Sequence, residues 1–115
     1  MAGNKKICGL LLETTIKGSK IHNAIIGIGL NVNQEKFPDF LNNAISLKNI
    51  TQINFDLDEL LIEVIEKIKE KIELLLAKKH TILETEYLNA LYKKNIPTVF
   101  KDSNDVLFMG KIIGI

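Results

Sequence analysis

The fold is decided by two stretches, Lys6-Ile7-Cys8-Gly9-Leu10-Leu11-Leu12-Glu13 and Ile26-Gly27-Ile28-Gly29-Leu30-Asn31-Val32-Asn33. The wider segments Ile7 to Thr15 and Ile21 to Val32 are rich in residues that favour strands, and Lys17-Gly18-Ser19-Lys20 between them supplies the residues of a turn. The sequence therefore predicts a β-hairpin. Its consecutive apolar residues, such as Ala24-Ile25-Ile26, predict burial on both faces, as in a sheet covered by helices.

Two helices are predicted in the second half of the chain. Asp56 is a good N-cap, with Glu59 at the capping-box spacing, and apolar residues at helical spacing follow from Leu57 to about Lys79. Thr81 and Glu84 repeat the capping pattern and predict a second helix that ends before Pro97.

The remaining segments are predicted to be a loop and a second hairpin. Gln34 to Asn54 is expected to be irregular and to dock on the core through Ile45 and Leu47 of Ala44-Ile45-Ser46-Leu47. Thr98 to Lys101 and Val106 to Ile113 are predicted to pair around a turn at Asp102-Ser103-Asn104-Asp105. The fold class expected from these elements is α+β.

Composition narrows the function classes. A chain of 115 residues with 46% hydrophobic and 25% charged residues suits a small globular domain. The net charge of +1 gives no general attraction for nucleic acid or anionic membranes, and no apolar run is long enough for a membrane span. Cys8 is the single cysteine, so no intrachain disulfide forms, which is typical of a cytoplasmic protein. All fifteen basic residues are Lys, and Trp is absent.

The two hairpin strands carry the residues suited to a binding site. Glycine weakens a strand and often marks close approach by a ligand, so Gly27 and Gly29 indicate a ligand lying against the sheet. Lys6 offers an ammonium for an anion, and Asn31 offers a bidentate amide. The alternative is that Lys5 and Lys6 are a solvated strand start and that the glycines are packing or bulge positions. No metal site is predicted, because His22 and His80 lack partners at ligand spacing, and a dinucleotide fingerprint is excluded by Val32 in place of the third glycine.

The residues of these segments and their order along the chain resemble those of the biotin-protein ligase (biotin–[acetyl-CoA-carboxylase] ligase) family. The Lys6 to Glu13 stretch is similar to the family's Lys-x-x-Gly-Ile-Leu-x-Glu strand, and Gly27 to Asn33 is similar to its Gly-Ile-Gly-x-Asn-x-Asn strand. Phe37-Pro38 and Ala44-Ile45-Ser46-Leu47 resemble the family's Pro-containing loop and its Ala-Thr-Ser-Leu. Tyr87-Leu88-Asn89-Ala90-Leu91-Tyr92 resembles its last helix before a small β-barrel.

This resemblance implies a fold and a division into domains. Residues 1–94 would be the C-terminal portion of a catalytic domain similar to class II synthetases, with an antiparallel or mixed sheet hairpin covered by helices. Residues 95–115 would be the start of a C-terminal SH3-like barrel. The family's Gly-Arg-Gly-x-x-x-Arg-x-Trp loop has no counterpart here, because the chain contains neither Arg nor Trp. We therefore expect the chain alone to be inactive.

The resemblance also implies a reaction and its residues. Biotin is activated by ATP, with Mg²⁺, to biotinyl-5′-AMP, and is then transferred to a lysine of a biotin carboxyl carrier protein. Lys6 corresponds to the family's essential lysine, with Lys5 as the alternative. Gly9, Gly27 and Ile28 join Lys6 at the biotin-lining positions, and Asn31 corresponds to a nucleotide contact.

Two other interpretations remain open from the sequence. The chain could be a non-catalytic module that associates with itself through its sheet, or a standalone structural α+β domain. The hairpin edges and the short C-terminal ribbon predict unpaired backbone, so we also expect a homo-oligomer.

Overall fold

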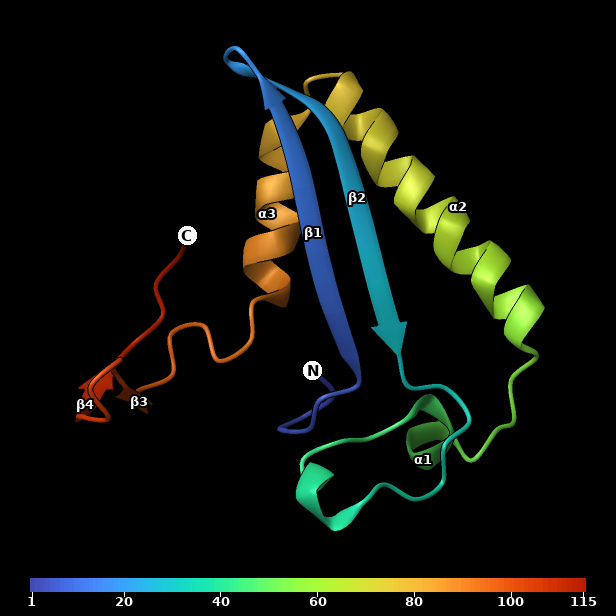
Figure 1. Cartoon of the computed structure of the whole chain (residues 1–115), viewed down its shortest axis with the longest axis vertical. Helices are drawn as coiled ribbons and strands as arrows, with labels where there is room; N and C mark the ends of the chain where they lie inside the picture. The colour runs from blue at the N-terminus through green and yellow to red at the C-terminus, as the bar shows by residue number, and fades with distance from the viewer. The chain divides into compact units, whose positions relative to one another are not determined.

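Two β-hairpins and several helices make up the chain in the computed structural model, which describes all 115 residues (Figure 1). The elements divide between two compact units, Met1–Leu61 and Ile62–Ile115. This content confirms the predicted α+β class. The predicted domain boundary after residue 94 stays a prediction.

The N-terminal hairpin consists of β1 (Cys8–Lys17) and β2 (Lys20–Leu30). The strands are antiparallel, with Cys8 opposite Leu30 at one end and Lys17 opposite Lys20 at the other. Gly18 occupies the turn with a positive φ of 65°, a conformation that glycine adopts without steric cost. The predicted hairpin and its turn are therefore confirmed.

The predicted burial of both hairpin faces is wrong for Met1–Leu61 by itself. Every residue from Leu10 to Gly29 is exposed, and Leu10 and Ile16 expose 75% and 67% of their surface. Burial of a sheet face needs a second layer packed against it, and the other elements of this unit lie beyond the ends of the strands rather than across them (Figure 1). Apolar runs in a strand indicate a face that is suited to burial, whether or not the covering layer belongs to the same unit.

The segment after β2 is more regular than predicted. It contains a short 3₁₀ helix, Asp39–Leu41, and the helix α1 (Leu47–Thr51). Ser46 caps α1: its hydroxyl accepts a hydrogen bond from the Asn49 backbone N–H, and the Asn49 side chain accepts one from the Ser46 N–H. The expected docking through Ala44-Ile45-Ser46-Leu47 occurs chiefly through these polar groups and the backbone, because Ser46 is the only fully buried residue in the chain.

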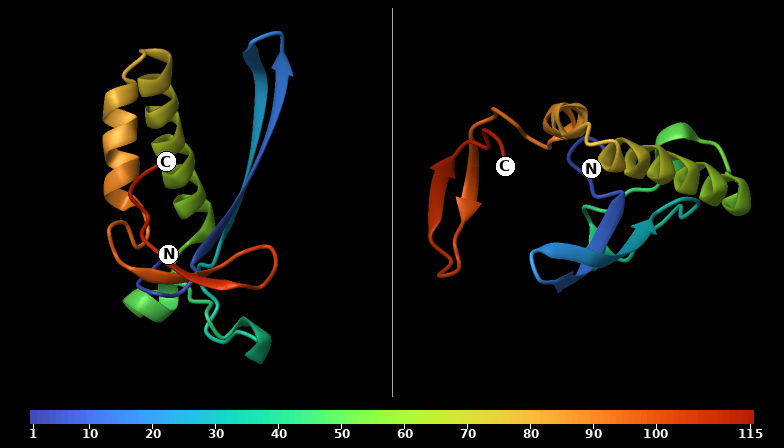
Figure 2. Two further views of the ribbon diagram at one scale, coloured as in Figure 1. Left: turned by 90° about the vertical axis from the view of Figure 1, so that its left-hand side faces the viewer. Right: turned by 90° about the horizontal axis from the view of Figure 1, so that it is seen from above.

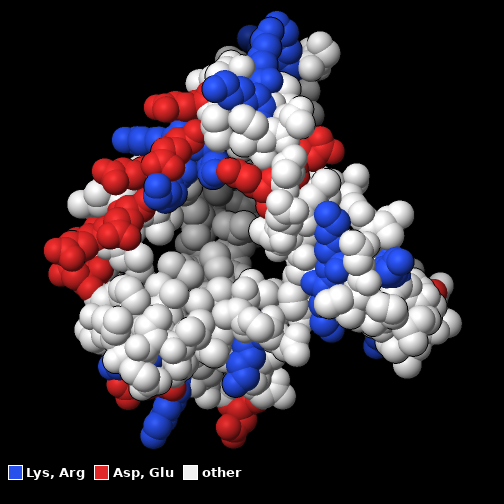
Figure 3. Space-filling view, turned by 180° about the vertical axis from the view of Figure 1, so that it is seen from behind, with Lys and Arg blue, Asp and Glu red and all other residues white.

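Helix α2 (Leu57–Leu76) begins where the sequence predicts. The Asp56 carboxylate accepts hydrogen bonds from the backbone N–H groups of Asp58 and Glu59, at 2.9 and 3.0 Å, which confirms Asp56 as the N-cap. The helix ends before the predicted position near Lys79, because the chain turns at Lys78 with a positive φ of 56°. Acidic and basic side chains are interleaved along its outer surface (Figure 3).

Helix α3 (His80–Ala90) does not begin as predicted. Its N-cap is Lys79, which makes no capping hydrogen bond through its side chain. Thr81 already lies inside the helix, where its carbonyl accepts a hydrogen bond from the Thr85 hydroxyl. The prediction failed because the chain already turns at Lys78 and the Lys79 carbonyl accepts the first hydrogen bonds of the helix. Helices α2 and α3 run side by side (Figures 1 and 2), and the Lys71–Glu86 ion pair of 2.6 Å joins them.

The C-terminal hairpin consists of β3 (Thr98–Lys101) and β4 (Leu107–Gly110). The Asp102 carboxylate holds its turn by accepting hydrogen bonds from the N–H groups of Asn104 and Val106. The Phe100 and Phe108 rings stack across the pair, with 5.6 Å between their centroids. The predicted hairpin is confirmed, with a shorter second strand. None of the helices combines the length and the apolar character that a membrane span requires.

Candidate functional site

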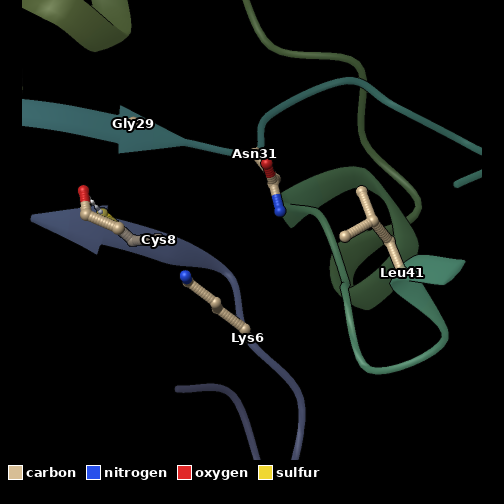
Figure 4. A pocket seen from close by; sticks show the side chains of 6 residues that line it. Lys6, Cys8, Gly29, Asn31 and Leu41 are labelled. Atoms are coloured by element: carbon tan, nitrogen blue, oxygen red, sulfur yellow. Dashed lines mark hydrogen bonds between the residues drawn. The ribbon is translucent and has the colours of Figure 1, made fainter.

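A pocket of about 280 Å³ lies at the open end of the β1–β2 hairpin (Figure 4). The residues around it come from the segment before β1, the facing ends of the two strands, and the loop that follows β2. They are Lys6, Cys8, Gly9, Gly29, Asn31 and Leu41. All of them belong to Met1–Leu61, so one unit provides the whole lining.

The floor of the pocket beside Lys6 is bare backbone. Gly9 and Gly29 are direct partners across the two strands, so neither strand places a side chain there. A Cβ atom on Gly9 would lie 3.8 Å from Cε and 3.9 Å from Nζ of Lys6. The Lys6 ammonium therefore lies beside Gly9, where an anionic group lying against the sheet would meet it.

The backbone of Lys6 is fixed by the loop. Its N–H donates to the carbonyl of Asn43 at 2.7 Å, and its carbonyl accepts from the N–H of Ile45 at 3.0 Å. Lys5 differs, because its backbone pairs with Ala2 in a turn and it does not line the pocket. This difference favours Lys6 over Lys5 as the site residue.

Asn31 follows β2 and is held by the same loop. Its backbone N–H donates to the Ile7 carbonyl at 2.9 Å, and its side-chain Nδ2 donates to the Ile45 carbonyl at 3.1 Å. Because a carbonyl can only accept, the Nδ2 end of the amide must face Ile45. This bond leaves Oδ1 as the acceptor of the Asn31 side chain.

Three of the predicted site residues come together in the pocket, and two do not. Lys6, Gly9 and Asn31 are part of the lining, whereas Gly27 and Ile28 lie outside it. Gly27 is the partner of a leucine on β1, and Ile28 is 41% exposed. Their assignment to biotin stays a prediction.

Some residues of the pocket and of the adjoining loop were not predicted from the sequence. Gly29 was predicted, together with Gly27, to mark a ligand against the sheet, but it was not placed among the biotin-lining positions. Leu41 carried no signal, because its place beside the pocket depends on the path of the loop. Asn33 was part of the quoted motif, and its side chain forms a double clamp on the backbone of Phe55, donating to the carbonyl at 2.8 Å and accepting from the N–H at 2.9 Å.

Lys6 is the only charged residue in the lining of the pocket. No group of three or more His, Cys, Asp or Glu side chains is placed to hold a metal ion. The nearest ion pair in the same loop is Lys48–Glu35, at 2.6 Å. The hydrogen bond and the positive charge from Lys48 lower the pKa of the Glu35 carboxyl.

Solved structures with a similar fold are biotin protein ligases. The ligase of Aquifex aeolicus in complex with biotin and ATP has 25% sequence identity to this chain and a TM-score of 0.75. The apo structure of that ligase gives the same identity and TM-score. In both comparisons the similarity covers 97% of this chain, but only 46% and 48% of the ligase chains.

The comparison confirms the resemblance that the sequence indicated: the chain has the fold of one part of a biotin protein ligase and spans about half the length of the ligases it matches. No protein-family model and no curated protein sequence matches the chain.

Proposed function

We propose that the chain supplies the lysine-bearing part of a biotin protein ligase site. In this proposal, biotin is activated by ATP to biotinyl-5′-AMP and then transferred to a lysine of a biotin carboxyl carrier protein. The observation that carries the proposal is the placement of the Lys6 ammonium beside Gly9, in one pocket with Gly29 and Asn31.

The first step explains the need for a cation at this position. The carboxylate of biotin attacks the α-phosphorus of ATP, a new oxygen–phosphorus bond forms, and pyrophosphate leaves. Negative charge grows on the phosphate and carboxylate oxygens in the transition state. A cation already fixed beside these oxygens stabilises the transition state more than the ground state. The backbone of Lys6 is held by two hydrogen bonds to the loop, and its ammonium lies beside Gly9.

The second step releases AMP. The amine of the carrier lysine attacks the acyl carbon of the adenylate, an amide bond forms, and the bond to the phosphate oxygen breaks. The bare backbone at Gly9 leaves room for a flat ligand, and we assign Gly9, Gly27 and Ile28 to biotin. The Oδ1 atom of Asn31 is assigned to the nucleotide, where it would accept a hydrogen bond.

Magnesium does not fit a protein-held site in this pocket. Mg²⁺ prefers oxygen ligands, commonly carboxylates and phosphates. No carboxylate is among the residues that line the pocket. Mg²⁺ would therefore enter with the phosphates of ATP, and no step is assigned to it here.

The reaction requires residues beyond this chain. The chain has no Arg or Trp for a loop that closes over the ligands, and the ligases with the same fold are about twice as long. We infer that a further polypeptide segment completes the site. A reaction that uses ATP as a substrate is consistent with the predicted cytoplasmic location.

Reconstitution tests the proposal. The chain is incubated with a carrier domain, biotin and MgATP, alone or with the separately produced N-terminal part of the Aquifex aeolicus ligase, and labelling is read with streptavidin. We expect no labelling by the chain alone and labelling by the mixture. Co-elution of the two polypeptides establishes that they have assembled.

Matched lysine variants then identify the catalytic group. Lys6→Ala should lower the labelling rate by about 10²–10³, the usual effect of removing one electrostatic contact to the transition state. Lys5→Ala is the control and should leave the rate unchanged. An unaltered rate in Lys6→Ala, or an assembled mixture that does not label, would count against the proposal.

A second candidate is a non-catalytic module that associates with itself. It is favoured by the apolar side chains exposed on the hairpin, where Leu11, Leu12 and Ile25 expose 65%, 62% and 66% of their surface. Faces of this kind are typical of interaction surfaces. Self-association without any labelling in the assembled mixture would support this candidate over the ligase.

A further inference from the structure

One residue, Ile45, links the two polar residues of the pocket through its backbone N–H and its backbone carbonyl. The N–H of Ile45 donates to the carbonyl of Lys6 at 3.0 Å, and the carbonyl of Ile45 accepts from Nδ2 of Asn31 at 3.1 Å. The two residues are far apart in the sequence. Lys6 precedes β1 and Asn31 follows β2, so both lie at the open end of the hairpin. The position of Ile45 therefore sets both the start of the Lys6 side chain and the orientation of the Asn31 amide.

The residue that holds Ile45 is its neighbour, Ser46. The Ser46 hydroxyl donates to the carbonyl of Gln34 at 2.5 Å and accepts from the N–H of Asn49 at 3.1 Å. These bonds tie the loop to the chain just after β2 on one side and to α1 on the other. Ser46 has no exposed surface, whereas the residues around the pocket are exposed or half-buried.

We propose that Ser46 is a positioning residue for the nucleotide side of the site: its hydroxyl anchors Ile45, and the Ile45 carbonyl holds the Nδ2 end of the Asn31 amide, which leaves Oδ1 as the acceptor for a ligand. This inference rests on the proposed function for the role of Asn31. It adds a residue that touches no substrate, yet selects the hydrogen-bonding character that the pocket presents. Without the anchor, the amide of Asn31 is free to rotate and to present a donor in place of the acceptor.

If Ser46 served only to stabilise the fold, removal of its hydroxyl would affect the whole unit rather than the loop alone. Ser46 does not contact the hairpin strands through its hydroxyl, so loss of the hydroxyl should leave the β1–β2 register intact. The change should be confined to the loop, the Ile45 peptide and the Asn31 amide. A general loss of folding would instead alter the signals of the hairpin as well.

Nuclear magnetic resonance on the full ¹⁵N-labelled chain, without ligand, tests the proposal. The side-chain amide signal of Asn31 is identified by its absence in Asn31→Ala. In Ser46→Ala, we expect this signal to shift and the Ile45 N–H to exchange about fivefold faster or more, the factor for one hydrogen bond of typical net strength. Ser46→Thr keeps the hydroxyl and should restore both readouts.

Two control variants keep the outcome decisive. Thr51→Ala removes a hydroxyl from the same helix that donates only to the Leu47 carbonyl and accepts only from the Ile53 N–H, and it should leave the Asn31 signal in place. Asn49→Ala keeps the Ser46 hydroxyl but removes the Asn49 acceptor of the Ser46 N–H, and it should move the Asn31 signal less than Ser46→Ala does. If Ser46→Ala melts the loop, Ser46→Cys is measured in its place, because a thiol fills the same position but is a weak donor and acceptor.

The proposal is overturned if the Asn31 signal is unchanged in Ser46→Ala, or if Asn49→Ala moves it to the same extent. These readouts need neither nucleotide nor activity. Failure of labelling in the reconstituted mixture would thus reject the ligase function without changing the result for Ser46.

Discussion

Replacement of Asn33 by Ala should release the start of α2 from the end of β2. The Asn33 side chain makes two hydrogen bonds with the backbone of Phe55, at 2.8 and 2.9 Å, and Phe55 immediately precedes the N-cap Asp56. A typical hydrogen bond contributes about 0.5–1.5 kcal/mol net, so the pair contributes about 1–3 kcal/mol at this half-buried position. Because about 1.4 kcal/mol corresponds to a factor of ten, the Phe55 N–H should exchange faster by a factor of about 5–150.

Amide hydrogen exchange at a single position measures this effect. Asn33→Asp provides a graded comparison, since its carboxylate still accepts from the Phe55 N–H but repels the Phe55 carbonyl. Its effect on exchange should be smaller than that of Asn33→Ala. Asn23→Ala, at an exposed position on β2, is the matched control and should have no effect at Phe55. Equal exchange in Asn33→Ala and the unaltered chain would show that the clamp does not hold this junction.

Three further predictions concern the site, the loop and assembly. Gly9→Ala should preserve the fold, since its Cβ would lie at an ordinary 3.8 Å from Cε of Lys6, but it should lower labelling in the reconstituted mixture by filling the ligand space; normal labelling would contradict this. The Glu35 carboxyl should titrate below its usual 4.5, so its link to Lys48 is present above about pH 4.5 and is lost as the pH falls further; a carboxyl titration that is the same in Lys48→Ala would contradict this. The chain should form a homo-oligomer through its exposed hairpin, and light scattering across a dilution series that shows only monomer would refute this.

The hairpins were predictable because their signals are local. Strand-forming residues flank a Gly-Ser turn in the first hairpin, and an Asp-Ser-Asn-Asp turn is flanked by apolar residues in the second. The start of α2 was predictable for the same reason, because Asp56 needs only the N–H groups of the next three residues. The start of α3 was not, since Thr81 has the composition of a cap but lies after the helix has begun.

The candidate site was only partly predictable. Gly9 lies on β1, Lys6 just precedes β1 and Asn31 just follows β2, so their proximity at one end of the hairpin follows from the strand register. Leu41 and Ser46 reach the site through the path of a loop, and no periodic pattern specifies such a path. A Ser at position 46 with Asn three residues later is a weak capping signal, and it was overlooked because the segment was expected to be irregular.

The link between Lys6 and Ile45 sets an order of assembly during synthesis. About 40 residues separate them, so at roughly 5–20 residues per second the lysine waits on the order of 2–8 seconds for its loop partner to be made. The hairpin strands emerge from the ribosome before the loop does, so they can pair before the pocket is complete. In the finished chain the loop should also open before the hairpin does. A loop held by a few hydrogen bonds opens more readily than a long strand pair. A modest destabilisation of the loop therefore reduces the population of the assembled pocket before it reduces the population of the hairpin.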